Sequence, residues 1–584
     1  MKKTFLTFAC VVASITALPA QTPATPSFAW GTLLDSPTAG DIANALACDR
    51  DGNLYYLGTE GSKGAAVDLT YGTDVIGTGA EYSGTSYNYN ALLVKTDKAG
   101  KLLWSVNSTQ GECAANNGTV SVLGDGSVLV TLKIRPTEGA IDKGFIMKDV
   151  DGNEFKVEWP GVETRYYKGA VLRFSAEGKL TSSNVIEVSD APQPGAAKNI
   201  TDALDINCGA VNESDDVFVG VRYRNPITLR NADNGTTTLV PHNVVGWGGD
   251  SQESVGDMAI LRFNNDGELT GSFTSASVIK ESKMLSLCYD DGKLYALALV
   301  KGDNGQSIDV AGKTITINDY ASPLLISFNG DLSLDWCEVF PASTVESRNP
   351  VLQSCSVRVV NGYLWITGMF NGAYDFGGKT VASKKGTTPR EGLLVKLSLR
   401  GEPLAATTSA ADYGLTVPGT TANCITGYLD IFANPSENDK VYLFGYGMNA
   451  KVGVFVRCYN IDTLTSDPSI DSWNIITGGG APIAQMMAYN PAESTLYVTA
   501  RGNSRFTVMD GEAPTPTAGY GFGEMLAAFS MPFEKASNGV EQVTDNADES
   551  EAVYYNLQGM RVVEPVNGIY IRKCGSKVEK VVIR

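Results

Sequence analysis

Short stretches of alternating apolar and polar residues recur along most of the chain, and Asp- and Gly-rich turns separate them. The clearest unit runs from Ala43 to Val106 and contains four such stretches, with one long connection between the second and the third. Alternation with a period of two is typical of a β-strand that is buried on one face. The unit therefore predicts four antiparallel strands joined by tight turns and one long loop.

The unit is repeated seven times along the chain, most clearly in its second and third stretches. The third stretches begin at Ala91, Ala170, Ala259, Leu324, Leu393, Val454 and Met525. The second stretches begin at Asn53, Val128, Val217, Lys293, Tyr363, Val441 and Thr495. Tyr, Val, Leu and Trp dominate the second stretches and suit the pleated surface of a sheet. Seven repeats of four strands predict an all-β fold, a seven-bladed β-propeller.

The first predicted strand, near the N-terminus, supplies the strand that the last repeat lacks. A polar stretch follows Met531, so the seventh repeat has no fourth strand of its own. The segment Phe28–Leu34 carries Trp30, and other fourth strands carry a Trp at the matching place: Trp104, Trp336 and Trp473. We expect this N-terminal strand to close the last blade, because closure pairs an edge that would otherwise be exposed.

The repeats resemble those of secreted bacterial β-propeller proteins, whose blades combine a Gly-Asn-x-Tyr strand, an Asp-Phe-Gly turn and a spaced Lys, Gly and Trp. The matching residues are Gly52–Gly58, Lys95, Gly100 and Trp104 in the first repeat, and Leu364–Gly368, Tyr374–Gly377, Lys396 and Gly401 in the fifth. The resemblance covers residues 28–534. It implies a fold and no particular chemistry.

The ends of the chain predict export. Residues 1–20 read as a signal peptide, with Lys2 and Lys3 before the apolar stretch Phe5–Ile15 and a cleavage site after Ala20. No later stretch is long and apolar enough to span a membrane. The predicted propeller then occupies residues 21–534, and an acidic, polar linker occupies residues 535–552.

The tail, residues 553–584, returns to strand patterns and predicts a small β appendage. It resembles the C-terminal sorting domain of the type IX secretion pathway of Bacteroidetes. The residues that carry this resemblance are Tyr555, Leu557, Gly559, Val562, the segment Gly568–Ile571 with Tyr570, Val581 and Arg584. The resemblance implies the type IX export machinery as a partner and a location in the medium or on the outer-membrane surface. The alternative is a packing appendage without a targeting role.

Composition excludes several classes of function. Lys and Arg total 46 against 64 Asp and Glu, so the net charge of −18 disfavours nucleic acid and anionic membranes. The chain has one histidine, His242, which we expect to be a solvated loop residue, and this removes most imidazole-based mechanisms. No nucleotide-binding glycine motif opens a helix. The sequence predicts no cofactor and no metal.

Two further residue patterns, the Asp-rich turns and the cysteines, bear on metal binding and disulfides. Asp49–Asn53 and Asp149–Asn153 look like the start of a calcium loop, but an apolar strand follows the first and the second lacks a distal carboxylate. Hairpin turns are the preferred interpretation. The cysteines include Cys48, Cys208 and Cys288 on predicted first strands, and no C-x-x-C occurs. Equivalent positions in different blades cannot all pair, so buried thiols are preferred to disulfides.

The candidate binding site lies in the long connections of the first three repeats, which are rich in aromatic residues. These residues are Tyr82, Tyr87, Tyr89, Trp159, Tyr166, Tyr167 and Trp247. Such rings can stack on sugars or anchor a protein partner. The alternative is that they pack the connections onto their own blades or belong to an extra hairpin.

Three functions remain open at this stage. The first, and the one we favour, is a non-catalytic binding scaffold for a glycan or a surface protein. The second is a carbohydrate-active enzyme with a carboxylate pair in the axial pocket. The third is a structural or adhesive surface protein.

Overall fold

The computed structural model shows a chain made almost wholly of β-strands, divided into two compact units, residues 1–534 and 535–584. The structure describes residues 25–35, 42–62, 68–78, 88–137, 140–159, 166–189, 203–242, 256–275, 279–345, 349–383, 391–409, 426–435, 437–447, 453–466, 472–478, 483–502, 505–509, 523–532, 553–555, 561–562, 568–574 and 577–583. The predicted signal peptide and the predicted linker lie outside these residues.

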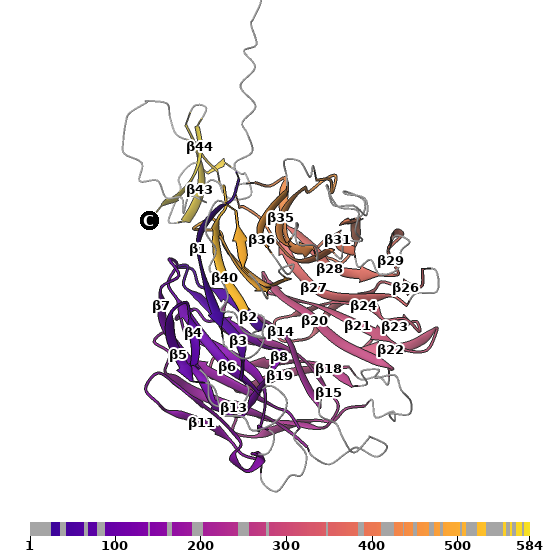
Figure 1. The fold of residues 1–584 in the computed structure, drawn as a ribbon. Coiled ribbons are helices and arrows are strands. Elements are labelled where there is room, and N and C mark those ends of the chain that lie inside the picture. Colours follow the sequence, from indigo (N-terminus) through magenta and orange to yellow (C-terminus); the bar gives the residue numbers. More distant parts are fainter. Residues whose placement is uncertain are drawn as a thin grey trace, which may run out of the picture. The chain divides into compact units, whose positions relative to one another are not determined.

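The described part of the first unit contains seven four-stranded antiparallel meanders, so the all-β propeller prediction is confirmed (Figure 1). From inner to outer strand they are β2 (Ile42–Cys48), β3 (Leu54–Ser62), β6 (Asn88–Thr96), β7 (Leu102–Gln110); β8 (Glu112–Val122), β9 (Val128–Arg135), β12 (Lys168–Phe174), β13 (Leu180–Val188); β14 (Leu204–Val211), β15 (Val217–Tyr223), β18 (Asp257–Phe263), β19 (Leu269–Thr274); β20 (Glu281–Asp290), β21 (Lys293–Lys301), β24 (Ser322–Asn329), β25 (Leu334–Val339); β27 (Val351–Val360), β28 (Tyr363–Asn371), β31 (Glu391–Leu397), β32 (Pro403–Thr408); β33 (Thr426–Phe432), β34 (Lys440–Gly447), β35 (Gly453–Asn460), β36 (Ser472–Gly478); and β37 (Ile483–Asn490), β38 (Thr495–Gly502), β40 (Gly523–Ser530), β1 (Ser27–Asp35). We refer to these meanders as blades 1 to 7.

The first strands of consecutive blades contact one another around the whole ring. β2 contacts β8, and the series continues through β14, β20, β27, β33 and β37 back to β2. Strand β1 pairs antiparallel with β40, with Trp30 opposite Ala528 and Leu33 opposite Met525. The prediction that the N-terminal strand closes the last blade is therefore confirmed (Figure 1).

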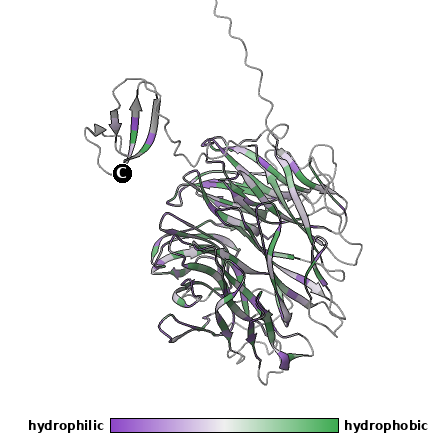
Figure 2. Cartoon of the chain, turned by 90° about the vertical axis from the view of Figure 1, so that its left-hand side faces the viewer, coloured by the Kyte–Doolittle hydropathy of each residue, from purple (hydrophilic) through white to green (hydrophobic). Residues whose placement is uncertain are grey.

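Apolar side chains fill the spaces between neighbouring blades. Leu57 and Leu93 of blade 1 form one cluster with Val130 and Leu172 of blade 2, and all four are fully buried. Comparable clusters lie between other neighbouring blades, and Figure 2 shows the hydrophobic residues running along the strands. Because each blade buries both faces, its middle strands are apolar on both sides.

The long connections of blades 1 to 3 fold as hairpins that cross to the preceding blade. The blade 1 connection contains β4 (Asp68–Tyr71) and β5 (Asp74–Thr78), and β4 pairs with β1 of blade 7. The blade 2 hairpin of β10 (Phe145–Lys148) and β11 (Glu154–Val157) pairs with β7 in the same way, and the blade 3 hairpin of β16 (Ile227–Arg230) and β17 (Thr236–Leu239) pairs with β13. Each hairpin covers an outer strand whose backbone groups would otherwise be exposed.

Blades 4 to 7 carry shorter extra strands, most of them in the connection between the second and third strands. Strand β39 (Phe506–Val508) pairs with β36 of blade 6. β22 (Gln306–Val310) and β23 (Lys313–Ile317) form a two-stranded sheet, and β26 (Ala342–Ser343), β29 (Ala373–Phe376) and β30 (Lys379–Ala382) form a three-stranded one. A 3-10 turn spans Ile141–Lys143.

The recurring tryptophan and glycine of the repeat join neighbouring blades. The Trp104 ring of β7 lies against Gly178 of blade 2, where an added Cβ would be 2.8 Å from the indole. The indole Nε1 also donates a hydrogen bond to the carbonyl oxygen of Ala176 at 2.9 Å. The same contact joins Trp30 to Gly100 and Trp336 to Gly401. The three glycines have φ between 79° and 85°, so both the turn and the ring require glycine.

The recurring lysine completes this contact. Lys95 Nζ donates to the same Ala176 oxygen at 3.0 Å and lies 4.9 Å above the ring of Tyr55. In blade 5, Lys396 Nζ donates to the Ile461 oxygen at 2.9 Å and lies 3.8 Å above Tyr363. The spaced Lys, Gly and Trp are thus a device for packing one blade on the next.

The second unit is a small antiparallel sheet, as predicted for the tail. Its strand order is β42 (Arg561–Val562), β41 (Val553–Tyr555), β43 (Gly568–Cys574) and β44 (Lys577–Ile583). Of the residues that carry the sorting resemblance, Tyr555, Gly568 and Tyr570 lie on these strands, and Tyr570 is buried. Leu557 and Gly559 lie outside the described residues.

Candidate functional site

The aromatic residues predicted as a binding surface do not form an exposed patch in the described structure. Trp159 and Tyr167 are buried, with 2% and 9% of their surface exposed, and Tyr89 and Tyr166 are half-buried. Tyr82, Tyr87 and Trp247 lie outside the described residues.

Trp159 and Tyr167 act inside the structure. Trp159 Nε1 donates to the Tyr166 oxygen at 3.2 Å, and Lys168 Nζ lies 4.8 Å above its ring. Lys133 Nζ and Arg135 Cζ lie 4.4 and 4.5 Å from the centre of the Tyr167 ring. The prediction that Trp159 and Tyr167 belong to an exposed binding surface is therefore wrong. Both rings pack inside the structure, beside the extra hairpin of β10 and β11, as the alternative interpretation expected.

A cavity lies at the axis of the propeller, between the seven first strands. It has a volume of about 560 Å³ and is lined by residues from β2, β8, β14, β20, β27, β33 and β37, with Phe444 and Tyr446 of β34 and Arg501 of β38. This size lies within the range of about 300–1,000 Å³ that is usual for small-molecule sites.

Every first strand shifts its register once beside this cavity. The shifts lie between Ala43 and Ala45, Cys113 and Gly118, Ile206 and Cys208, Met284 and Ser286, Gln353 and Ser356, Tyr428 and Asp430, and Ala484 and Met487. A β-bulge inserts extra residues into one strand and re-aims its side chains. The bulge residues that line the cavity include Asn44, Asn116, Asn207, Leu285, Ser354, Leu429 and Gln485. We call these seven residues the bulge ring.

Backbone conformation at two of the bulges departs from the strand region. Asn116 has φ 56° and Ser354 has φ 48°, both in the left-handed region. Asn44 holds the first of these in place, because its Oδ1 accepts a hydrogen bond from Asn116 N at 2.7 Å and its Nδ2 donates to Ala114 O at 3.3 Å. Strain of this kind persists only where surrounding contacts determine the conformation.

Other bulge residues keep unused hydrogen-bonding groups. Asn207 Nδ2 is buried and has no partner within the described structure. The side chains of Asn116, Ser354 and Gln485 line the cavity and also make no hydrogen bond to a described residue. These groups are free to bind a ligand.

One ion pair stands in the cavity wall. Arg358 of β27 donates from Nη2 to Asp430 Oδ2 at 2.7 Å and from Nη1 to Val357 O at 3.0 Å. Burial lowers the pKa of Arg358, but Asp430 outweighs this effect and the net pKa is raised. Arg501, also in the lining, stands directly opposite Glu524 in the β38–β40 ladder, and Glu524 is fully buried. Within the described lining, Asp430 is the one carboxylate.

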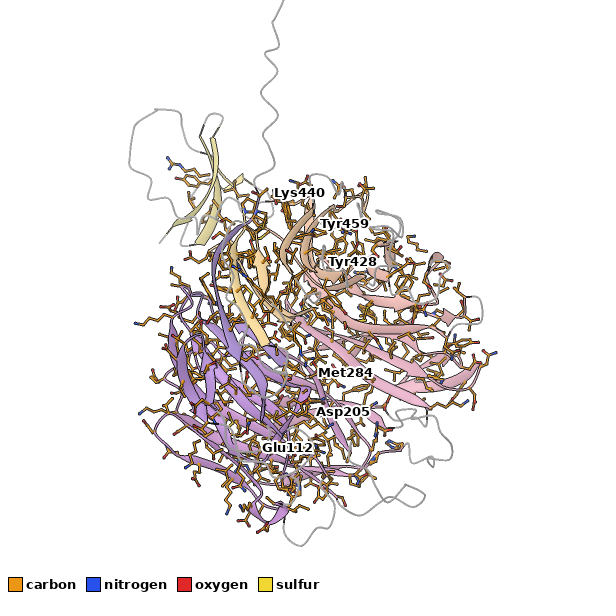
Figure 3. The ribbon with its side chains drawn as sticks, in the orientation of Figure 1. Glu112, Asp205, Met284, Tyr428, Lys440 and Tyr459 are labelled. Carbon is orange, nitrogen blue, oxygen red and sulfur yellow. The ribbon has the colours of Figure 1, made fainter. Side chains whose placement is uncertain are left out.

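A second charged cluster joins blades 2 and 3. Asp205 accepts from Lys133 Nζ at 2.7 Å and from both Nε and Nη2 of Arg222. Nearby Glu112 accepts from Arg135 at 2.8 Å, and Figure 3 shows Glu112 and Asp205 in this part of the molecule. Burial raises the pKa of Asp205, but the two cations outweigh it and lower the value to about 2. All the charges in this cluster have protein partners, so it reads as a structural element.

The two Asp-rich turns bind their own backbone. Asp49 Oδ1 accepts from the N–H groups of Asp51 and Asn53, at 3.0 and 2.8 Å, and Asp149 repeats this pattern with Asp151 and Asn153. These contacts support the hairpin-turn interpretation over calcium. No cluster of three or more metal-ligating side chains occurs among the described residues.

Seven cysteines whose side chains the structure describes are free thiols: Cys48, Cys113, Cys208, Cys288, Cys337, Cys355 and Cys458. Burial raises the pKa of Cys48, Cys113 and Cys208 to about 12, which makes them poor nucleophiles.

His242 is half exposed, but it is more firmly held than a solvated loop residue. Its backbone N–H donates to Asp257 Oδ2 at 2.6 Å, and its Nδ1 lies 3.0 Å from the same oxygen. The carboxylate of Asp257 is fully buried and is a feature that the sequence did not indicate.

Comparisons with known proteins show no matching family model and no matching curated protein. Among solved structures, the chain is similar to the quinohemoprotein alcohol dehydrogenase ADHIIG of Pseudomonas putida HK5, at 12% identity over 91% of this chain and 80% of that chain, with a TM-score of 0.34. A polysaccharide lyase, the PL25 ulvan lyase, is 8% identical over 84% of this chain and 97% of that chain, with a TM-score of 0.39. A streptogramin B lyase is 10% identical over 86% of this chain and 100% of that chain, with a TM-score of 0.27. At such values, none of these similarities bears on the chemistry of this chain.

A search of the described residues finds no helix that combines the length and the apolar character needed to cross a membrane.

Proposed function

We propose that the protein is an exported, non-catalytic binding propeller that takes a glycan, or a group of a surface protein, into its axial cavity. The observation that carries this proposal is the bulge ring. It presents Asn116, Asn207, Ser354 and Gln485 to a cavity of about 560 Å³ while leaving their polar groups without a described partner. An unpaired polar group in a cavity is costly unless a ligand or water satisfies it.

The charges in the cavity support binding over glycoside cleavage. Cleavage by the usual mechanism uses two carboxyl groups that flank the scissile bond. The described lining offers Asp430, and Arg358 holds that carboxylate in an ion pair at 2.7 Å. A base or nucleophile would first have to leave this pair.

The aromatic residues of the long connections would make secondary contacts with the ligand. Tyr82, Tyr87 and Trp247 remain predicted ligand contacts outside the described residues. Tyr89 and Tyr166 are half-buried and keep part of their surface exposed. They would add contacts to a larger ligand, whereas the axial cavity provides the primary site.

The binding proposal is tested with a glycan array, followed by titration calorimetry of each positive glycan against the wild type and Asn207→Leu. We expect Asn207→Leu to weaken binding about threefold to tenfold, because one hydrogen bond contributes about 0.5–1.5 kcal/mol. Binding that is unchanged in this variant would place the site elsewhere. Mass spectrometry of the glycan after prolonged incubation tests catalysis: shortened products that disappear in Asp430→Asn would overturn the non-catalytic proposal.

Export rests on the two chain ends. We propose that residues 1–20 direct secretion and that residues 553–584 address the protein to the type IX machinery, which leads to the medium or the outer-membrane surface. The support is the sequence resemblance of the tail, together with its fold as a separate compact unit. Deletion of residues 553–584 should leave the propeller in the periplasm of a fractionated cell. Surface display that survives the deletion would contradict the sorting role.

A further inference from the structure

The bulge ring is chemically divided into two arcs. Blades 7, 1, 2 and 3 are consecutive around the axis and contribute four amides: Gln485, Asn44, Asn116 and Asn207. Blades 4, 5 and 6 complete the ring with Leu285, Ser354 and Leu429. At the bulges, one side of the ring therefore presents hydrogen-bonding amides and the other side presents two leucines and one hydroxyl. Blades 4 to 6 also contribute Ser286, Ser356 and the Arg358–Asp430 ion pair to the cavity wall.

From this division we infer that the axial cavity selects a neutral, hydroxyl-rich ring ligand, a pyranose-type sugar, and this inference rests on the binding function proposed above. A sugar ring carries hydroxyl groups around its rim and C–H groups on its face. The amide arc suits the hydroxyl groups, because each amide offers both a donor and an acceptor. The C–H face suits Leu285 and Leu429, which gain from burying apolar surface.

The amide arc, formed by Gln485, Asn44, Asn116 and Asn207, has side-chain amide groups that are available to bind a ligand. Asn44 is committed to Asn116 N and Ala114 O, so it acts as a support. Asn116, with its backbone held by Asn44, and Asn207 and Gln485 direct unused amide groups at the cavity. Three amides on three consecutive or nearly consecutive blades can contact neighbouring hydroxyl groups of one ring.

The balance of charge in the lining favours a neutral ligand. Arg358 is paired with Asp430, and Arg501 stands opposite the buried Glu524. An anionic ligand that binds Arg358 would have to displace the Asp430 carboxylate from it. That exchange leaves the displaced carboxylate buried without its partner, which is unfavourable. The net charge of −18 adds a general repulsion of anions.

The experiment compares neutral sugars with their acidic counterparts by titration calorimetry, for example glucose-type with glucuronate-type oligosaccharides and galactose-type with galacturonate-type ones. Four variants are compared with the wild type: Gln485→Leu, Asn207→Leu, Leu285→Asn and Gln110→Leu. Gln110 is the matched control, because it is a half-buried glutamine at the end of outer strand β7 and is not part of the cavity lining. Circular dichroism checks that each variant is folded.

We expect neutral sugars to bind more tightly than their acidic counterparts. Gln485→Leu and Asn207→Leu should each weaken binding about threefold to tenfold, and Gln110→Leu should leave it unchanged. Leu285→Asn should also weaken binding, although it adds a polar group, because the leucine arc supplies apolar contact. Tighter binding of the acidic sugars, or tighter binding after Leu285→Asn, would overturn the inference.

Two further outcomes separate this inference from the proposed function. If no sugar binds but another small molecule binds in a way that Asn207→Leu abolishes, the inference is wrong and the axial binding site stands. If sugars bind equally well to the wild type, Asn207→Leu and Gln485→Leu, both the inference and the axial site are wrong.

Discussion

The inner and outer strands of the propeller are built from the same repeat but follow different rules. The outer strands keep the recurring residues, with Trp30, Trp104 and Trp336 each seated on a glycine of the next blade. The inner strands all break their register beside the axis, and the residues at those breaks differ from blade to blade. The comparison shows where the repeat is constrained: the same Trp and Gly residues join neighbouring blades at three junctions, whereas the residues at the axis differ from blade to blade.

The physical reason lies in what each strand contacts. An outer strand meets a neighbouring blade whose backbone is fixed, so the indole of Trp104 fits only where Gly178 leaves room. An inner strand meets the cavity, where a bulge can turn a side chain toward open space. Stability therefore resides between the blades, and under the proposed function ligand specificity resides at the axis.

The largest expected effect comes from the charged cluster on the inner strand of blade 3. Asp205→Ala should lower the free energy of unfolding by about 3–5 kcal/mol, because it leaves Lys133 and Arg222 buried without their carboxylate. Urea denaturation followed by tryptophan fluorescence measures the change. Asp266→Ala is the control, since Asp266 pairs with Arg173 with 58% of its side chain exposed and should cost less than about 1 kcal/mol. Equal effects in the two variants would contradict the structural role of the cluster.

The contact between tryptophan and glycine should show the next effect. Gly100→Ala should lower the free energy of unfolding by about 3 kcal/mol, from left-handed strain and from a Cβ 2.5 Å from the Trp30 ring. Gly152→Ala isolates the strain, because Gly152 has φ 83° and nothing lies within 4 Å of an added Cβ. It should cost about 1 kcal/mol. The same denaturation experiment compares both variants. Similar losses of unfolding free energy would show that the contact with the Trp30 indole does not contribute to blade packing.

Acid should weaken the same inner cluster. The pKa of Asp205 falls from 3.8 in the unfolded chain to about 2 in the folded protein, so its contribution is present above pH 4. It is lost as the pH falls from about 4 to 2, and it amounts to about 2 kcal/mol. Unfolding free energies of wild type and Asp205→Asn, measured from pH 5 to pH 2, should converge as the pH falls. A constant difference across this range would show that protonation of Asp205 is unimportant.

The smallest effect is expected on the hairpin of β10 and β11 that covers strand β7. Lys148 and Glu154 form an ion pair at 3.0 Å between β10 and β11, and their side chains are 45% and 46% exposed. Lys148→Ala should change the free energy of unfolding by no more than about 0.5 kcal/mol, because water and salt screen such a pair. Thermal unfolding at low and high salt measures it. A loss comparable with that of Gly100→Ala would mean that the hairpins, more than the tryptophans, hold the blades.

The strand order and the ring closure were predictable because they depend on local patterns. The third stretches of the repeats were recognisable as strands from their short apolar runs, although the structure buries both of their faces. Trp30 identifies the closing strand by its place in the repeat. The sequence predicted an extra hairpin in these connections only as an alternative. Nothing in the connection before Tyr89 indicates that its hairpin pairs with a different blade. Trp159 and Tyr167 have the composition of a binding surface, and only their burial reveals a packing role.

The axial site had a weak signal in the sequence. Asn44, Asn116 and Asn207 stand in the middle of first strands, where an amide is unfavourable unless its position is special. Alternation alone cannot reveal a bulge, because one inserted residue exchanges the two faces of the strand beyond it. The partnership of Arg358 with Asp430 is equally non-local, since the two residues belong to different blades.

The amino-acid sequence by itself determined the repeat, the number of strands in each unit and the residues that seat one blade on the next, because each of these depends on short-range alternation and on fixed spacings. Only the tertiary structure decided where the long connections pair, which aromatic rings are buried and which residues meet at the axis. Those features depend on contacts between segments far apart in the chain, whose geometry exists only once the ring has closed.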